Sequence, residues 1–230
     1  MASTLAERVL YQDNHLIILN KNAGELVQGD KTGDKTLADE AQVYLKEKFK
    51  KPGEAFIGIP HRLDRPVSGI VIYAKTSKGL SRMTNLFRVK EIEKTYWAVV
   101  EKAPKEKSGT LNNYMIKNEK QNKSYVSETE KPEYKQAILH YRLIASSDKY
   151  HLIEVNLETG RHHQIRAQLA HMGCIIKGDL KYGAARSNPD GSIHLHSRRC
   201  KFIHPIKDTE INITAPCPKD ALWQFFEGAS

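Results

Sequence analysis

The sequence predicts an α+β fold with a long, mainly antiparallel mixed sheet that is flanked by helices and loops. Short apolar runs rich in β-forming residues recur along the chain, separated by clusters of turn-forming residues. Helical spacing of apolar residues appears in only a few segments. The length of 230 residues and the hydrophobic content of 40% suffice for one core. We therefore expect a single domain over residues 1–230, with about eight N-terminal and about five C-terminal residues peripheral to it.

In the first third of the chain, the apolar runs 9–11 and 15–21 lie on either side of a turn-forming cluster, which is typical of paired strands. Thr36 begins a capping box, so we expect a helix from there to about Phe49. The other elements expected here are strands at 55–59 and 70–75 and a helix that Ser77 caps.

In the remainder, residues 102–132 are rich in lysine and turn-forming residues and predict an exposed hairpin around 118–122. Gly160 permits a sharp turn from a strand into a helix whose apolar stripe includes Ile165 and Leu169. The other elements expected are strands at 93–101, 135–145, 150–158, 195–205 and 210–215, a short strand within 173–183, and a helical turn at 222–226.

Composition bounds the partners and the compartment. The net charge of +9, from 36 Lys and Arg against 27 Asp and Glu, favours a polyanionic partner such as a nucleic acid. Three cysteines without Cys-x-x-Cys spacing argue against a disulfide framework and a zinc site. No signal peptide or membrane-spanning run is apparent, so we expect a cytoplasmic protein. The histidines lack zinc-site spacing, so we expect no metal.

The stretch from Pro60 to Gly69 carries the first chemical signal. Asp64 stands between Arg62 and Arg65 in a segment with prolines and a glycine, so we expect it on a shaped loop before a strand. The neighbouring guanidiniums favour the ionised carboxylate, which suits a nucleophile better than a general acid. A structural ion pair is the alternative, since such clusters are often only structural.

The second signal is the stretch 157–166, which leads from a strand into a helix. His162 and Arg166 are four residues apart, so they share one flank of that helix and could face a cleft.

These stretches resemble the motifs of the RluA-type pseudouridine synthases. The matches are Tyr11 to Gly24, His61 to Gly69, Lys94-Tyr96-Ala98-Val100 on a strand, 157–166, 178–183 and 195–205. The pattern departs at four positions. The family usually has proline in place of Asn22, threonine in place of Val67, threonine or serine in place of His162, and leucine in place of Cys200. The first motif starts near residue 10, so we expect no N-terminal S4 domain.

The resemblance implies an isomerase that converts uridine to pseudouridine in ribosomal or transfer RNA, acting as a monomer without a cofactor. By this resemblance Asp64 is the nucleophile, Tyr96 lies against the target base, and Arg166 pairs with Asp64. Arg62 is a candidate wedge in the space that a flipped base leaves. The remaining candidate RNA contacts are His61, Arg65, Arg161 and His162.

Two other functions stay open at the level of sequence. One is a non-catalytic RNA-binding or RNA-folding protein on the same scaffold. The other is a carboxylate-based hydrolase of nucleosides or glycosides, which requires a second catalytic acid. No such acid is obvious near Asp64.

Overall fold

Alternation along two central strands explains how the first part of the chain is layered. Strand β2 (Leu16–Lys21) pairs antiparallel with β3 (Ser68–Ala74). Leu16 and Ile18 join one buried cluster with Met83 of helix α2 (Ser77–Val89), whereas Ile17 and Leu19 join another with α1 (Leu37–Lys48). Successive side chains of a strand point to opposite faces, so the two helices cover opposite faces of these strands.

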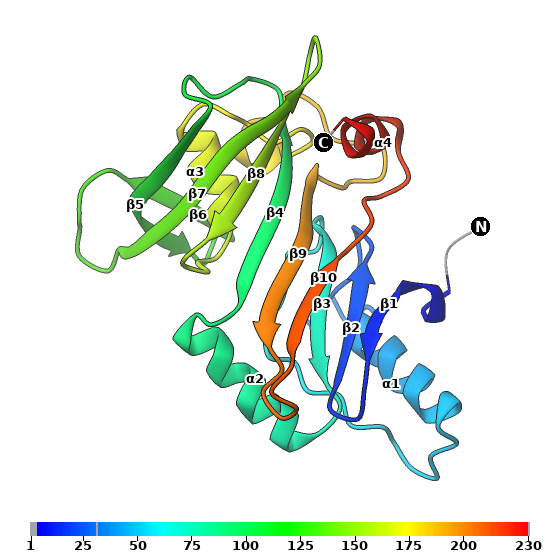
Figure 1. Cartoon of the computed structure of the whole chain (residues 1–230). Coiled ribbons are helices and arrows are strands. Elements are labelled where there is room, and N and C mark those ends of the chain that lie inside the picture. The colour runs from blue at the N-terminus through cyan, green and yellow to red at the C-terminus, as the bar shows by residue number, and fades with distance from the viewer. Residues whose placement is uncertain (1–3, 31, 230) are drawn as a thin grey trace. The chain divides into compact units, whose positions relative to one another are not determined.

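The structure is a computed structural model that describes residues 4–30 and 32–229, and Figure 1 shows its elements. The chain divides into two compact units. Unit 1 is Met1–Glu93 with Ser197–Pro216, and unit 2 is Lys94–His196 with Cys217–Ser230. The described residues contain ten strands and four α-helices.

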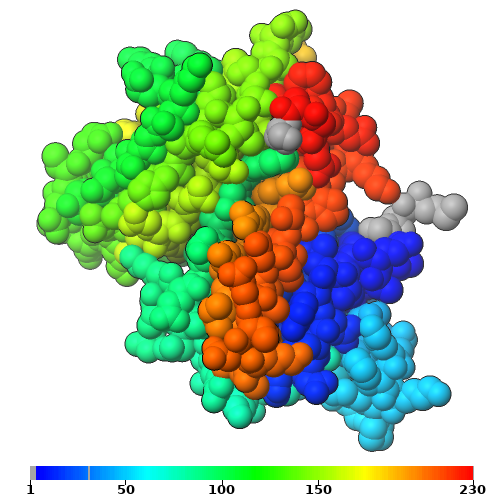
Figure 2. Space-filling view, viewed as in Figure 1, coloured from blue at the N-terminus to red at the C-terminus, as the bar shows by residue number. Residues whose placement is uncertain are grey.

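Unit 1 contains the strand order β1-β2-β3-β9, and β10 pairs with β9. The elements not yet given are the 3-10 helix η1 (Ala6–Arg8), β1 (Val9–Gln12), β9 (Leu195–Ile203) and β10 (Glu210–Thr214). The late segment Ser197–Pro216, orange in Figures 1 and 2, lies beside the blue N-terminal strands. The Nδ2 of Asn20 donates to the carbonyl oxygen of Pro216 at 3.0 Å, which ties the two segments together.

Unit 2 is built on the antiparallel strand order β4-β8-β7-β5-β6. Its elements are β4 (Glu93–Val100), β5 (Ser108–Asn118), β6 (Lys123–Ser127), β7 (Lys135–Ser146), β8 (His151–Leu157), α3 (Gln164–His171), the 3-10 helix η2 (Leu180–Tyr182) and α4 (Ala221–Gly228). The α+β class with mainly antiparallel strands is thus confirmed, as is the hairpin around 118–122.

Three local predictions are wrong. Residues 55–59 form only an isolated bridge, Gly58 to Ala74, instead of a strand. Residues 173–183 likewise contain a bridge at Ile176 and the 3-10 helix η2, with no strand. Helix α2 is capped by Thr76, whose side chain accepts the Gly79 N–H, and Ser77 is its first residue.

The predicted turn from a strand into a helix is present between β8 and α3. Its left-handed residue is His163, with φ 53°, and Gly160 has no positive φ. The expectation of peripheral ends also fails at two residues. Arg8 is 7% exposed and Phe226 lies in the core of unit 2. The final helix α4, which holds Phe226, is longer than the single turn expected.

Gly69 illustrates a tight constraint at the start of β3. Its φ is +109°, and a Cβ built there would lie 2.3 Å from the carbonyl oxygen of Ser197 in β9. The neighbour is backbone, so it cannot rotate away as a flexible side chain could. Only glycine therefore fits without displacing a strand.

Gly69→Ala is expected to lower the free energy of unfolding by at least about 2 kcal/mol, because it combines a strained φ with a backbone clash. Gly53→Ala is the matched control, since its Cβ meets nothing within 4 Å and its φ is not positive. The control is expected to stay within about 0.5 kcal/mol of the wild type. Urea unfolding measures both, and equal midpoints for the two variants would contradict the constraint.

Candidate active site

The Asp64 loop, residues 60–67, leads directly into β3 in unit 1. Asp64 is half-buried, and its carbonyl oxygen accepts the Val67 N–H at 3.1 Å, which closes a turn around Pro66. Val67 is buried, and Leu63 packs against the cluster under α1. The loop is therefore shaped by its own turn and by packing at both ends, as the prolines and Gly69 predicted.

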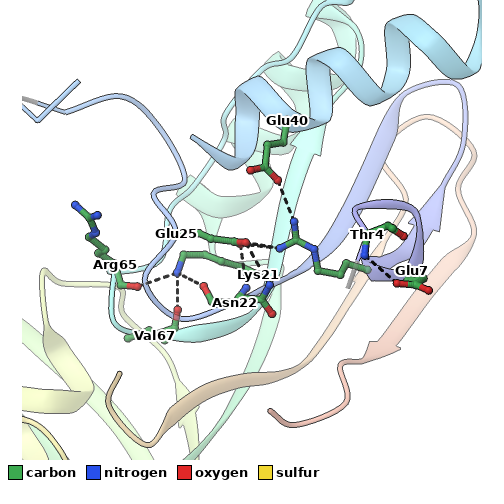
Figure 3. A network of polar contacts seen from close by, with 9 residues as sticks. Thr4, Glu7, Lys21, Asn22, Glu25, Glu40, Arg65 and Val67 are labelled. Carbon is green, nitrogen blue, oxygen red and sulfur yellow. Dashed lines mark hydrogen bonds and ion pairs between the residues drawn. The ribbon is translucent and has the colours of Figure 1, made fainter. Parts of the chain in front are cut away.

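Lys21, at the end of β2, supports this loop from inside the unit. Its side chain is 1% exposed, and its Nζ donates to the carbonyl oxygens of Asn22 (2.9 Å), Arg65 (3.0 Å) and Val67 (2.6 Å) (Figure 3). Burial lowers the pKa of Lys21 to about 8, although the negative charges of Glu25 and Asp64 act to raise it. The sequence marked Lys21 in two ways, as a lysine that directly continues an apolar run and as part of the N-terminal stretch that resembles the family pattern, but it assigned the residue no role.

Arg65 binds the loop to the N-terminal segment. Its Nε donates to the Gly24 carbonyl oxygen at 2.9 Å, and its Nη1 lies 2.9 Å from the Asp34 carboxylate. In return, the Gly24 N–H donates to the Arg65 carbonyl oxygen at 2.8 Å. Arg65 thus has a structural role in this loop, beyond the RNA contact that the sequence suggested.

The two other predicted residues of this stretch differ in exposure. His61 Nε2 accepts the Ile72 N–H of β3 at 2.8 Å, and its ring stacks on Phe87 of α2 at 4.4 Å between centroids. These two contacts fix the His61 side chain within unit 1. Arg62, by contrast, is exposed.

Charged side chains next to Lys21 fix the segment that follows β2, as Figure 3 shows. Glu25 accepts from the backbone N–H of Asn22 at 3.1 Å and from its side chain at 3.2 Å. Arg8 bonds both oxygens of Glu25, at 2.6 and 2.8 Å, and reaches Glu40 of α1 at 3.0 Å. Asn22 stands where the family pattern has proline, which has no backbone N–H. Here the Asn22 N–H donates to Glu25, so Glu25 fixes the chain at this position.

In unit 2, Tyr96 and Arg166 are both buried. Tyr96 lies on β4 opposite Val155 of β8. Arg166 of α3 is 5% exposed and forms a bidentate pair with Asp179, which is 1% exposed. Its Nε and Nη2 donate to the two carboxylate oxygens at 2.7 and 2.9 Å. These bonds use two of the five guanidinium N–H groups.

Asp179 is a functional candidate that the sequence analysis did not assign, although it lies in the stretch 178–183 that matched the family pattern. A bidentate carboxylate fixes the plane of the guanidinium and keeps it charged. The Tyr182 ring, 5.2 Å from Arg166 Cζ, covers the same group. Arg166 is therefore a pre-oriented cation within unit 2.

His162 and its neighbours connect α3 to the β5–β6 hairpin. The rings of His162 and His163 stack at 3.7 Å between centroids. Ser124 of β6 donates its hydroxyl to the His162 carbonyl oxygen at 2.7 Å and lies 2.9 Å from His162 Nδ1. Tyr182 accepts the Ser124 N–H at 2.9 Å and lies 3.0 Å from His163 Nδ1. The unusual His162 thus contributes a second contact to the hairpin.

Arg161 is also tied to its own unit. Its Nε donates to the Gln136 carbonyl oxygen at 2.9 Å, and its backbone N–H donates to the Gln164 side chain at 2.9 Å. Of the predicted residues, unit 1 therefore holds His61, Arg62, Asp64 and Arg65, and unit 2 holds Tyr96, Arg161, His162 and Arg166.

The other histidines have polar neighbours of their own. His194 lies 2.9 Å from Asn188 and 3.5 Å from Asp220, and burial lowers its pKa to about 4. His204 lies 3.0 Å from Asp13. Within residues 4–30 and 32–229, no group of three or more His, Cys, Asp or Glu side chains is arranged to hold a metal ion. None of the helices described there is both long and apolar enough to cross a membrane.

The motifs and their geometry agree with the comparison with known families. The model described as RNA pseudouridylate synthase matches residues 15–171, a range that includes Asp64, Tyr96 and Arg166. The chain belongs to this family. Membership confirms the predicted family and the predicted enzyme class, an isomerase, and pseudouridine synthases act on RNA.

Relatives across several bacteria support the assignment. An uncharacterised RNA pseudouridine synthase of Synechocystis is 32% identical over 223 residues, which cover 95% of this chain and 68% of that protein. A ribosomal large subunit pseudouridine synthase D of Xylella fastidiosa is 30% identical, with 92% of this chain and 66% of the relative covered. A synthase C of Vibrio vulnificus is 31% identical with the same coverage. The chain spans about two thirds of the length of these synthases.

Solved structures share the fold. The human RNA pseudouridylate synthase domain containing 4 protein has a TM-score of 0.80 at 22% identity, covering 96% of this chain and 93% of that chain. The human domain containing 1 protein has a TM-score of 0.70 at 16% identity with the same coverage. At these identities the likeness concerns the fold alone.

Asp179→Asn is expected to destabilise the protein by about 3 kcal/mol, because it leaves the Arg166 guanidinium buried without its counter-charge. The matched control is Glu154→Gln, which removes the carboxylate of the more exposed Arg142–Glu154 pair of unit 2. That change is expected to cost at most about 1 kcal/mol. Thermal and urea unfolding measure both; a similar small loss in each would show that the buried pair is not a stabilising element.

Proposed function

We propose that the protein is an RNA pseudouridine synthase that isomerises particular uridines of ribosomal or transfer RNA with Asp64 as its nucleophile. The observation that carries the proposal is the position of Asp64, on a braced loop inside the matched range 15–171. The naming of relatives as ribosomal large subunit synthases favours ribosomal RNA as the first substrate to test.

The isomerisation of uridine requires little from the protein beyond a carboxylate that is held in position. The reaction breaks the bond between N1 of uracil and C1′ of the ribose and forms one between C5 and C1′. C5 loses a proton and N1 gains one, so substrate and product are isomers and no oxidant or reductant takes part. An ionised Asp64 could attack C1′ of the ribose or C6 of the uracil, or assist through a glycal.

The remaining roles follow the family pattern. Tyr96 lies against the target base and helps to remove the C5 proton. Arg166, kept charged and oriented by Asp179, is the partner of Asp64. Arg62, whose exposure suits this task, occupies the space that the flipped uridine leaves. His61, Arg65, Arg161 and His162 shape the surroundings of the RNA.

We also propose that residues 1–230 act as one catalytic domain, as a monomer, in the cytoplasm, on RNA bound through the basic surface of the chain. The family match supports the single domain, since it contains parts of both units. The net charge of +9 supports RNA binding. The ribosomal substrates named for the relatives support the compartment.

The function is tested by carbodiimide mapping of pseudouridine in ribosomal and transfer RNA after treatment with purified protein. Wild type is expected to produce new stops at particular uridines, and Asp64→Ala is expected to lose at least about a thousandfold in rate. Asp148→Ala, an exposed aspartate in the turn between β7 and β8, is the control and is expected to match wild type.

Two results would contradict the proposal. Equal modification by wild type and Asp64→Ala would exclude Asp64 as the nucleophile. Tight RNA binding by both proteins without modification of any RNA would instead favour the non-catalytic RNA-binding function.

A further inference from the structure

The carboxylate of Glu25 joins Arg8 to the turn that follows β2, residues 22–25 (Figure 3). Each of its two oxygens accepts one bond from Arg8 and one from Asn22. Oε1 lies 2.6 Å from Arg8 Nη1 and 3.2 Å from Asn22 Nδ2. Oε2 lies 2.8 Å from Arg8 Nη1 and 3.1 Å from the Asn22 backbone nitrogen. The position of the carboxylate therefore fixes Asn22, both at its backbone and at its side chain.

Arg8 is itself fixed within unit 1, so it can serve as an anchor for the carboxylate. It ends the 3-10 helix η1, its N–H donates to the Leu5 carbonyl oxygen at 3.0 Å, and it is 7% exposed. The side chains of Leu5 and Val9 pack against the apolar cluster under α1. Its Nη2 reaches Glu40 of α1 at 3.0 Å. Charge-assisted bonds of this kind are the strong ones, so the guanidinium connects α1 to the 22–25 turn.

The 22–25 turn in turn contacts the backbone next to Asp64. The Gly24 N–H donates to the Arg65 carbonyl oxygen at 2.8 Å, and Arg65 Nε donates to the Gly24 carbonyl oxygen at 2.9 Å. Arg65 directly follows Asp64. A shift of the turn would therefore displace the residue that carries the carboxylate, or break these two bonds.

The residue at position 22 explains why this chain needs such an anchor. A proline there, as in the family pattern, would restrict φ through its own ring. Asparagine leaves that dihedral free, and the two bonds from Asn22 to Glu25 restrict it instead. Since Glu25 is held by Arg8, the order of the turn depends on a side chain of η1.

We propose that Arg8 is a positioning residue for Asp64, which acts by holding Glu25 and thereby the 22–25 turn against the Asp64 loop. The effect on catalysis rests on the proposed function. The hold on the turn does not, so it is measured separately below.

The first experiment compares the two carboxylates that bind Arg8. In Glu25→Gln an amide NH₂ replaces one oxygen and meets a donor of Arg8 or Asn22, which is unfavourable. We expect kcat to fall about tenfold while the KM for RNA stays within about twofold, because a misplaced reactive group costs rate. Glu40→Gln is the matched control, since it changes the bond of Arg8 to α1, and its kcat is expected to stay within about twofold. An equal fall in both variants, or an unchanged kcat in Glu25→Gln, would overturn the proposal.

The second experiment asks whether a proline can replace the anchor. Arg8→Met is expected to lower kcat about tenfold in the chain with Asn22. In an Asn22→Pro background the same change is expected to cost less than about threefold, because the ring restricts φ without Glu25. The four proteins form a double-mutant cycle, which measures the coupling of the two positions.

The cycle also separates the turn from the charges around it. Asn22→Pro restores no charge, so a smaller loss in its background reports the order of the turn and not the electrostatics of the neighbouring Lys21. If Arg8→Met costs the same in both backgrounds, Arg8 does not act through the turn and the proposal fails.

Hydrogen exchange separates this proposal from the proposed function. The Gly24 amide, which donates to the Arg65 carbonyl oxygen, is expected to lose protection about tenfold in Glu25→Gln and to keep it in Glu40→Gln. If the wild type modifies no RNA, the synthase function fails while this comparison still decides whether the anchor holds the turn. Equal Gly24 protection in the wild type and in Glu25→Gln would show that it does not.

Discussion

One buried ammonium bonded to three backbone carbonyls is the constraint on which the Asp64 loop depends. An unpaired charge in the core is costly, so Lys21 is tolerated only because its donors are fully used and Glu25 lies close by. The same bonds fix the loop, since the carbonyls belong to Arg65 and Val67 next to the carboxylate. Arg166 in unit 2 follows the same rule with Asp179 as its counter-charge. Both units thus bury a cation and use it to order the residues around it.

Much of the fold could be predicted because its signals are local. The alternating strand from Leu16, the capping box at Thr36 and the turn residues of the 118–122 hairpin each specify an element within a few residues. The wrong predictions involve choices that local signals leave open. Thr76 and Ser77 are both good caps, and only the geometry selects the first. Residues 55–59 resemble a strand, yet they find a partner only at Gly58.

The sequence identified the chemically distinctive residues of the site, but it did not identify the residues that hold them in place. Asp64 and Arg166 stand in motifs, and a carboxylate on a proline-containing loop carries its own argument. Lys21 contacts the Asp64 loop from a strand that is distant in the sequence. Ser124 likewise contacts His162 from the β5–β6 hairpin. Such pairings depend on tertiary packing, which one sequence does not display. Asp179 lay inside a recognised stretch, but nothing local marks it as the partner of a buried arginine.

The distribution of aromatic and thiol side chains gives each unit its own spectroscopic and chemical reporter. Both tryptophans of the chain, Trp97 and Trp223, lie in one buried cluster of unit 2, so tryptophan fluorescence follows that unit alone. Unit 1 has a single cysteine, Cys200, which is buried in its core and whose pKa burial raises to about 12. Its alkylation therefore requires that unit 1 open. Emission and thiol labelling, recorded on the unmodified sequence, can distinguish concerted opening of the two units from independent opening.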